Sequence, residues 1–183
     1  MTGAQNVELV ADDTISDLCH AHLTGSPPLV AVRGGVIRIR YPRILTSPFR
    51  FRAAILRLNS TLPWDIDIRG GAQQVHADLR HTELTRLVVR GGAARVGLQM
   101  PPPRGAVSLS FSRGVHRLRI QRPRDTAFRV VVQGGATRAH LDDEVFRAVG
   151  GVLEWQTSGY VDAADRYDLT IGGGASGLTV ASN

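Results

Sequence analysis

Arginine residues at fixed spacing are the part of this sequence best suited to chemistry, in the form of anion binding. The basic residues number 22, and all of them are arginines. Measured from the last glycine of a repeated Gly-Gly phrase, one column of arginines lies three residues after it and a second lies two residues before it. The first column comprises Arg38, Arg95, Arg117 and Arg138, with Gln74 in the same position, and the second comprises Arg33, Arg69 and Arg90.

Guanidinium groups stacked in such columns repel one another unless acids or a bound anion screen them. The two columns are therefore candidate sites for binding a partner or an anionic group, such as a phosphate, a nucleic acid or an acidic protein surface. The alternative is that the guanidinium planes stack on one another and stay hydrated, with no ligand.

Other residues that could do chemistry do not form a motif. Cys19, His20 and His22 are close in sequence, but neighbouring helix positions point in different directions and no matching Cys/His pair occurs elsewhere, so no metal site is predicted. Asp65 and Asp67 fall at outward strand positions and are predicted to be solvated. Nucleotide-binding and Gly-x-Ser-x-Gly phrases are absent from the sequence, so we predict a protein with no cofactor and no enzymatic activity. A carbohydrate-active enzyme remains a third, weaker alternative, because such a site needs clustered acids or bases.

A repeat of about one Gly-Gly phrase every 21 residues positions these arginines. The central intervals between phrases are 21, 22 and 21 residues. Around each glycine, apolar residues recur at the same five positions and alternate with polar ones, which is typical of strands with one buried face. The aligned glycines are Gly35, Gly71, Gly92, Gly114, Gly135 and Gly174, of which Gly114 follows an arginine in place of the first glycine.

This period predicts an all-β fold, a single-domain parallel β-solenoid (β-helix) of about six to seven coils. The competing architecture is an antiparallel sandwich or barrel, which also spaces short strands regularly. The phrase from Thr14 to Asp17 has the pattern of a capping box and predicts a short N-terminal helix through Leu23 that covers the first coil. The predicted division is a cap segment at 1–28 and a solenoid domain at 29–183. Residues 42–63 fit either a helix or a strand.

The repeats resemble those of a known group of proteins. The phrases that start at Trp64, Leu87, Val130 and Asp165 and run through Gly-Gly-Ala are similar to the repeats of uncharacterised actinobacterial proteins, akin to toastrack or "putative adhesin" β-solenoid domains. The resemblance covers about residues 29–181. It implies a β-solenoid architecture and carries no information about an activity.

Charge and composition lead to the functional prediction. The single cysteine, the lack of a basic and apolar leader and the lack of an 18-residue apolar stretch predict a cytoplasmic protein without a membrane span. Residues 1–28 hold four acids and no arginine, and residues 140–183 hold seven acids and two arginines. Acidic ends would oppose head-to-tail stacking, so a monomer or a laterally paired dimer is expected. We predict a scaffold or protein-interaction module that binds another protein; the alternative is binding of nucleic acid or another polyanion through the arginine columns.

Overall fold

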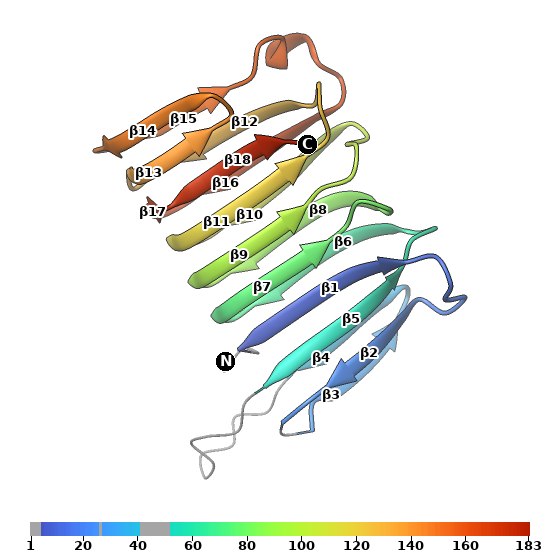
Figure 1. The fold of residues 1–183 in the computed structure, drawn as a ribbon. Helices are drawn as coiled ribbons and strands as arrows, with labels where there is room; N and C mark the ends of the chain where they lie inside the picture. The colour runs from blue at the N-terminus through green and yellow to red at the C-terminus, as the bar shows by residue number, and fades with distance from the viewer. Residues whose placement is uncertain (1–4, 26, 41–51) are drawn as a thin grey trace.

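The computed structural model describes residues 5–25, 27–40 and 52–183, and within them the chain is almost entirely β-structure. A ten-stranded sheet, which we call the long sheet, faces a six-stranded short sheet, and a separate two-stranded hairpin completes the fold (Figure 1). The long sheet contains β1 (Asn6–Asp12), β2 (Cys19–Leu23), β5 (Ala53–Asn59), β7 (Ala72–Asp78), β9 (Ala93–Gln99), β11 (Val115–Arg122), β13 (Ala136–Leu141), β14 (Glu144–Val149), β17 (Ala175–Ser176) and β18 (Leu178–Ser182). The short sheet contains β6 (Pro63–Arg69), β8 (Glu83–Arg90), β10 (Ala106–Phe111), β12 (Ala127–Val132), β15 (Leu153–Gln156) and β16 (Arg166–Ile171). The hairpin consists of β3 (Leu29–Arg33) and β4 (Val36–Arg40), and a 3-10 helix η1 spans Tyr160–Asp162.

Each later Gly-Gly phrase joins a strand of the short sheet to a strand of the long sheet. The strands of successive units pair in parallel, for example β7 with β9 and β9 with β11. In this register Ala72, Ala93 and Val115 lie side by side, so the predicted apolar column after the glycine is a column in the structure. The alternating pattern of the sequence therefore places one face of each strand between the two sheets.

The order of the units in space differs from their order in the sequence. The strands β16, β17 and β18 lie between the units β10–β11 and β12–β13. At the other end, β1 lies between β5 and β7. Both ends of the chain are thus threaded into the middle of the stack, as the blue and red strands of Figure 1 show.

The core is a layer of aliphatic and aromatic side chains between the two sheets. Leu109, Val130 and Val132 are each 0% exposed. Burial of a side chain of this size contributes about 1.5–3 kcal/mol to stability. A polar group in this layer, the Tyr167 hydroxyl, is satisfied because it donates to the Pro101 carbonyl at 2.8 Å. Burial raises the pKa of Tyr167 well above its ordinary value.

The prediction of a parallel β-solenoid is wrong, whereas the all-β class is confirmed. Both large sheets are mixed: β2 pairs with β5, β13 with β14 and β12 with β15, all in antiparallel orientation. Asp142, with φ of 48°, lies in the tight turn that reverses the chain from β13 to β14. Such hairpins allow the sheets to end without another full unit.

The predicted N-terminal helix is also wrong. Residues 13–18 form bends and irregular structure, and Cys19–Leu23 is the strand β2. The polar residues that suggest a helix cap serve other partners: Thr14 donates to Asp12, and the Asn59 side chain donates to the Ile15 carbonyl. Short polar side chains often satisfy irregular backbone in this way, and here strand pairing with β5 outweighs the local helix signal.

The first Gly-Gly phrase forms the turn of the β3–β4 hairpin and does not form a unit of the stack. Gly34 and Gly35 have φ of 54° and 73°, as a tight two-residue hairpin turn requires. The predicted inward residues Val30 and Val32 are 52% and 56% exposed. Of the open segment 42–63, residues 41–51 lie outside the described part of the chain, and the remainder contains β5 and the start of β6, so the strand alternative is confirmed there.

Candidate anion-binding face

Three arginines of the predicted column after the glycine lie on the outer face of the long sheet. Arg95 and Arg117 are register partners on β9 and β11, with side chains exposed. Arg138 lies two strands from Arg117, because Gly177 of the inserted strands occupies the position between them. The backbone of Arg138 has φ of 54°, and its guanidinium group donates to Ser176 Oγ at 3.3 Å.

A fourth arginine, Arg119, belongs to the same face. It follows Arg117 by two residues on β11, is exposed and has Gly97 as its register partner on β9. The sequence analysis missed it because the columns were defined from the glycine alone. The signal that could have found it is the period of two, which puts both residues on one face of the strand.

Carboxylates do not neutralise this face. Within 5–25, 27–40 and 52–183, no acid lies within 4.0 Å of the guanidinium nitrogens of Arg95, Arg117, Arg119 or Arg138. His116 on β11 and His140 on β13 are exposed on strands that carry these arginines, and His76 is exposed on the neighbouring β7. We call the four arginines the basic face.

The short sheet shows the opposite arrangement. Asp67 accepts from Arg69 Nε at 2.9 Å and from Arg90 Nε at 3.1 Å, so a single carboxylate bridges two of the three predicted arginines of the second column. On the neighbouring row Arg86 pairs with Asp65 at 3.0 Å. Asp65 and Asp67 lie on the outer face of the strand, as predicted, and the structure adds that each pairs with an arginine on the adjacent strand.

The remaining predicted site residues, Arg33 and Arg38, lie in the β3–β4 hairpin. The hairpin forms its own two-stranded sheet, so these two arginines are not members of either column. The seven predicted residues thus separate into three on the basic face, two in ion pairs on the short sheet and two in the hairpin.

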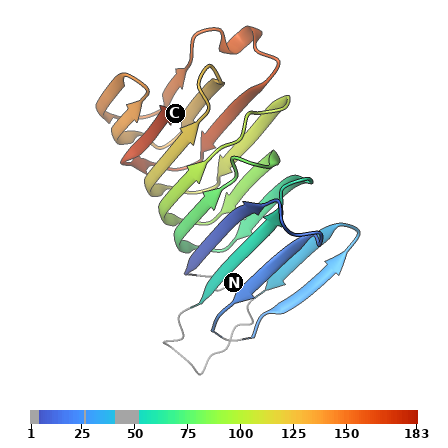
Figure 2. The same ribbon diagram turned by 45° about the vertical axis from the view of Figure 1, so that its right-hand side comes forward.

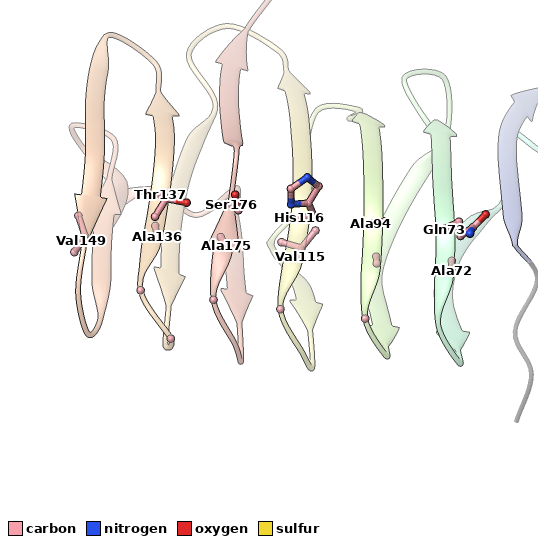
Figure 3. A pocket seen from close by; sticks show the side chains of 16 residues that line it. Ala72, Gln73, Ala94, Val115, His116, Ala136, Thr137, Val149, Ala175 and Ser176 are labelled. Atoms are coloured by element: carbon pink, nitrogen blue, oxygen red, sulfur yellow. The ribbon is translucent and has the colours of Figure 1, made fainter.

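An open groove of about 680 Å³ runs along the Gly-Gly turns beside the basic face. Figure 3 shows that small side chains such as Ala94 and Ala175 line it together with the larger Gln73, His116 and Thr137. Ala94, His116 and Thr137 each directly precede an arginine of the basic face. The groove and the arginines therefore form one continuous surface.

The histidines and the cysteine near the N-terminus do not converge. Cys19 is half-buried, and His20 and His22 are exposed on β2. His20 Nε2 lies 3.2 Å from Asp17 Oδ2, which is an exposed pair. A search of the described ranges finds no group of three metal-ligating side chains. In the same part of the chain no helix has the length and apolar character needed to cross a membrane.

Comparisons with known proteins identify the fold. No family model and no curated protein matches the chain. A solved structure from Clostridium sporogenes ATCC 15579, described as a "putative cell adhesion protein", matches with a TM-score of 0.69 and 15% sequence identity, over 99% of this chain and 94% of that chain. At this identity the likeness concerns the fold alone. It supports the adhesin-like architecture that the sequence resemblance implied, whereas the link to actinobacterial Gly-Gly-Ala proteins stays a prediction.

Proposed function

We propose that this protein is a non-enzymatic binding module that uses its basic face to hold an anionic partner. The observation that carries the proposal is the contrast between the two sheets. On the short sheet Asp67 pairs with the predicted Arg69 and Arg90, and Asp65 pairs with Arg86, whereas among the described residues no acid pairs with an arginine of the basic face. Uncompensated arginines on one face of a folded protein attract polyanions and steer their approach.

The spacing of the basic face favours an extended partner. Neighbouring strands lie about 4.8 Å apart, so Arg95 and Arg117 offer two guanidinium groups at nearly one strand spacing. Arg119 adds a third group further along β11. A guanidinium group binds phosphate, sulfate or carboxylate through two parallel hydrogen bonds, which suits a chain of repeated anionic groups. We therefore propose a linear polyanion, in preference to an acidic protein, as the partner.

A scaffold that binds another protein is the second candidate. It is favoured by the shallow groove of Gly and Ala residues beside the arginines, because a flat surface of this kind allows close approach of a partner backbone. The adhesion role described for the structural neighbour also concerns binding. Both candidates use the same face, and they differ in how strongly the interaction depends on salt.

The test is binding to fluorescent heparin and to single-stranded DNA over a range of salt concentrations. For the polyanion candidate, the triple variant Arg95→Gln, Arg117→Gln and Arg138→Gln should bind at least about tenfold more weakly, and its salt slope should fall by about two to three units. The matched control is Arg69→Gln, Arg86→Gln and Arg90→Gln, which removes the same charge from the short sheet and should retain the affinity. Equal losses in both triple variants would show that net charge alone is responsible. A wild-type protein that binds neither ligand at physiological salt would favour the scaffold candidate.

A further inference from the structure

The two ends of the strand stack carry opposite charge. One end is formed by β2 and by the β3–β4 hairpin, and the other by β14 and β15 (Figure 2). Residues 19–40, at the first end, contain three arginines, two histidines and no acid. Residues 142–163, which contain β14, β15 and η1 at the second end, hold five acids and one arginine.

This distribution was hidden in the sequence. The first 28 residues contain four acids, but two of them, Glu8 and Asp12, lie on β1, which pairs with β5 and β7 inside the long sheet. Asp17, just before β2, is paired with His20. The two ends of the stack are therefore not both acidic, and charge repulsion does not oppose head-to-tail contact.

Both ends also expose apolar side chains. At the hairpin, Leu29, Val30 and Val32 are 68%, 52% and 56% exposed. At the acidic end, Val145, Val152 and Val161 are 60%, 51% and 74% exposed. Apolar groups surrounded by complementary charge are typical of protein contact surfaces.

The outermost strands leave one backbone edge without a partner in their sheets. In the long sheet β2 and β14 are the terminal strands, and in the short sheet β15 is terminal at the acidic end. Unpaired edges of this kind can accept a strand from another molecule.

We propose that copies of this chain associate head to tail, with the hairpin end of one copy against the acidic end of the next. This interaction surface is distinct from the basic face and does not depend on the function proposed for it. The two contacting surfaces are different, so the contact is heterologous, and because they lie at opposite ends of the strand stack its repetition leads to linear oligomers. The charge complementarity also sets the polarity of the oligomer, because two like ends repel.

The test is sedimentation velocity of the full chain over a concentration series at low and at high salt. The wild-type protein should form oligomers that grow with concentration and weaken as salt rises. Variant N, Arg33→Glu with Arg38→Glu, makes both ends acidic. Variant C, Asp143→Arg with Glu154→Arg and Asp162→Arg, reverses three exposed acids at the opposite end and makes both ends basic. Each variant alone should show a dissociation constant at least about tenfold higher than the wild type.

An equimolar mixture of variants N and C provides the decisive measurement, because an acidic end then meets a basic end again. The mixture should recover association to near the wild-type level, in alternating copies. The control is the Arg95, Arg117 and Arg138 triple variant, which should associate like the wild type because its substitutions lie on the basic face. A wild-type protein that stays monomeric at all concentrations would overturn the proposal. So would a mixture that stays monomeric, or a loss of association in the control.

Discussion

Gly114 lies against Gly174, although 60 residues separate them in the sequence. A Cβ atom on Gly114 would lie 2.9 Å from the Gly174 carbonyl oxygen, closer than side chains ordinarily allow. Gly174 in turn lies against Gly134 and Gly135. The Gly-Gly turns therefore stack directly on one another, and the last turn of the sequence is inserted between two earlier ones.

This contact predicts the effect of a single methyl group. In Gly173→Ala the new Cβ would lie 2.5 Å from the Gly114 backbone nitrogen, and backbone on both sides leaves it little room to move. We expect the free energy of unfolding to fall by about 1–3 kcal/mol, measured by urea denaturation. The control is Gly92→Ala, where no atom lies within 4 Å of the added Cβ. Equal stability of the two variants would mean that the turns are not stacked as described.

The apolar columns could be predicted from the sequence because each strand has one buried face. Five positions around the glycine recur, and the pairing of Ile66 with Leu87 and of Leu87 with Leu109 places one of these columns in register. The same uniformity hides the order of the units. Leu118 could pair with Ala139 or with Leu178 at the same column, and the structure contains the second pairing. A repeat with nearly equivalent units does not specify which neighbour each unit takes.

The candidate site could be predicted only in part from the sequence, because the pairing of strands from different units is not specified locally. The spacing identified Arg95, Arg117 and Arg138, because their position three residues after the turn glycine is fixed by local sequence. It did not separate them from Arg69 and Arg90, whose neutralisation depends on Asp67 lying on an outer strand face between them. The first Gly-Gly phrase was wrongly counted as a repeat unit, because Gly34 and Gly35 can equally form the turn of an isolated hairpin.

The buried positions of the core predict that a charged substitution there unfolds the protein. Val89 and Val132 are each 0% exposed, so Val89→Asp or Val132→Asp would bury a carboxylate without a partner. The cost is several kcal/mol, a large part of the ~5–15 kcal/mol that stabilises a typical domain. We expect loss of the cooperative thermal transition in circular dichroism. The identical substitution Val161→Asp, at a residue 74% exposed, should melt near the wild-type temperature.

Asp67 offers a gain-of-binding prediction. In Asp67→Asn the carboxylate that bridges Arg69 and Arg90 is lost, and two guanidinium groups become free for an external anion. If uncompensated arginines bind polyanions, heparin affinity should rise about twofold to tenfold at low salt. Stability should change by less than about 1 kcal/mol, because exposed ion pairs contribute little. Asp78→Asn, which frees Arg80 at a turn away from both sheet faces, is the control; an equal rise there would attribute the gain to net charge.

Asp12 predicts how stability responds to acid. Its Oδ1 accepts from the Thr14 hydroxyl at 2.6 Å and from the Thr14 backbone N–H at 2.9 Å, and its Oδ2 lies 3.0 Å from Arg57 Nε. The Thr14 hydrogen bonds, with the Arg57 charge, lower the pKa of Asp12 below its ordinary value. A carboxyl whose pKa is lower in the folded state stabilises the fold above the pKa of the unfolded chain, about 3.9, and loses this contribution as pH falls below it.

The variant Asp12→Asn removes that contribution, and its amide would also bring a donor toward Arg57 Nε. We expect Asp12→Asn to unfold at lower urea concentration than the wild type at pH 7. The difference between the two proteins should shrink as the pH falls below about 4, because the wild-type carboxyl then gains a proton as well. The neighbouring exposed residue supplies the control: Asp13→Asn should follow the wild type at both pH values. A difference that stays constant between pH 7 and pH 3 would assign the effect of Asp12 to packing and would rule out its charge as the cause.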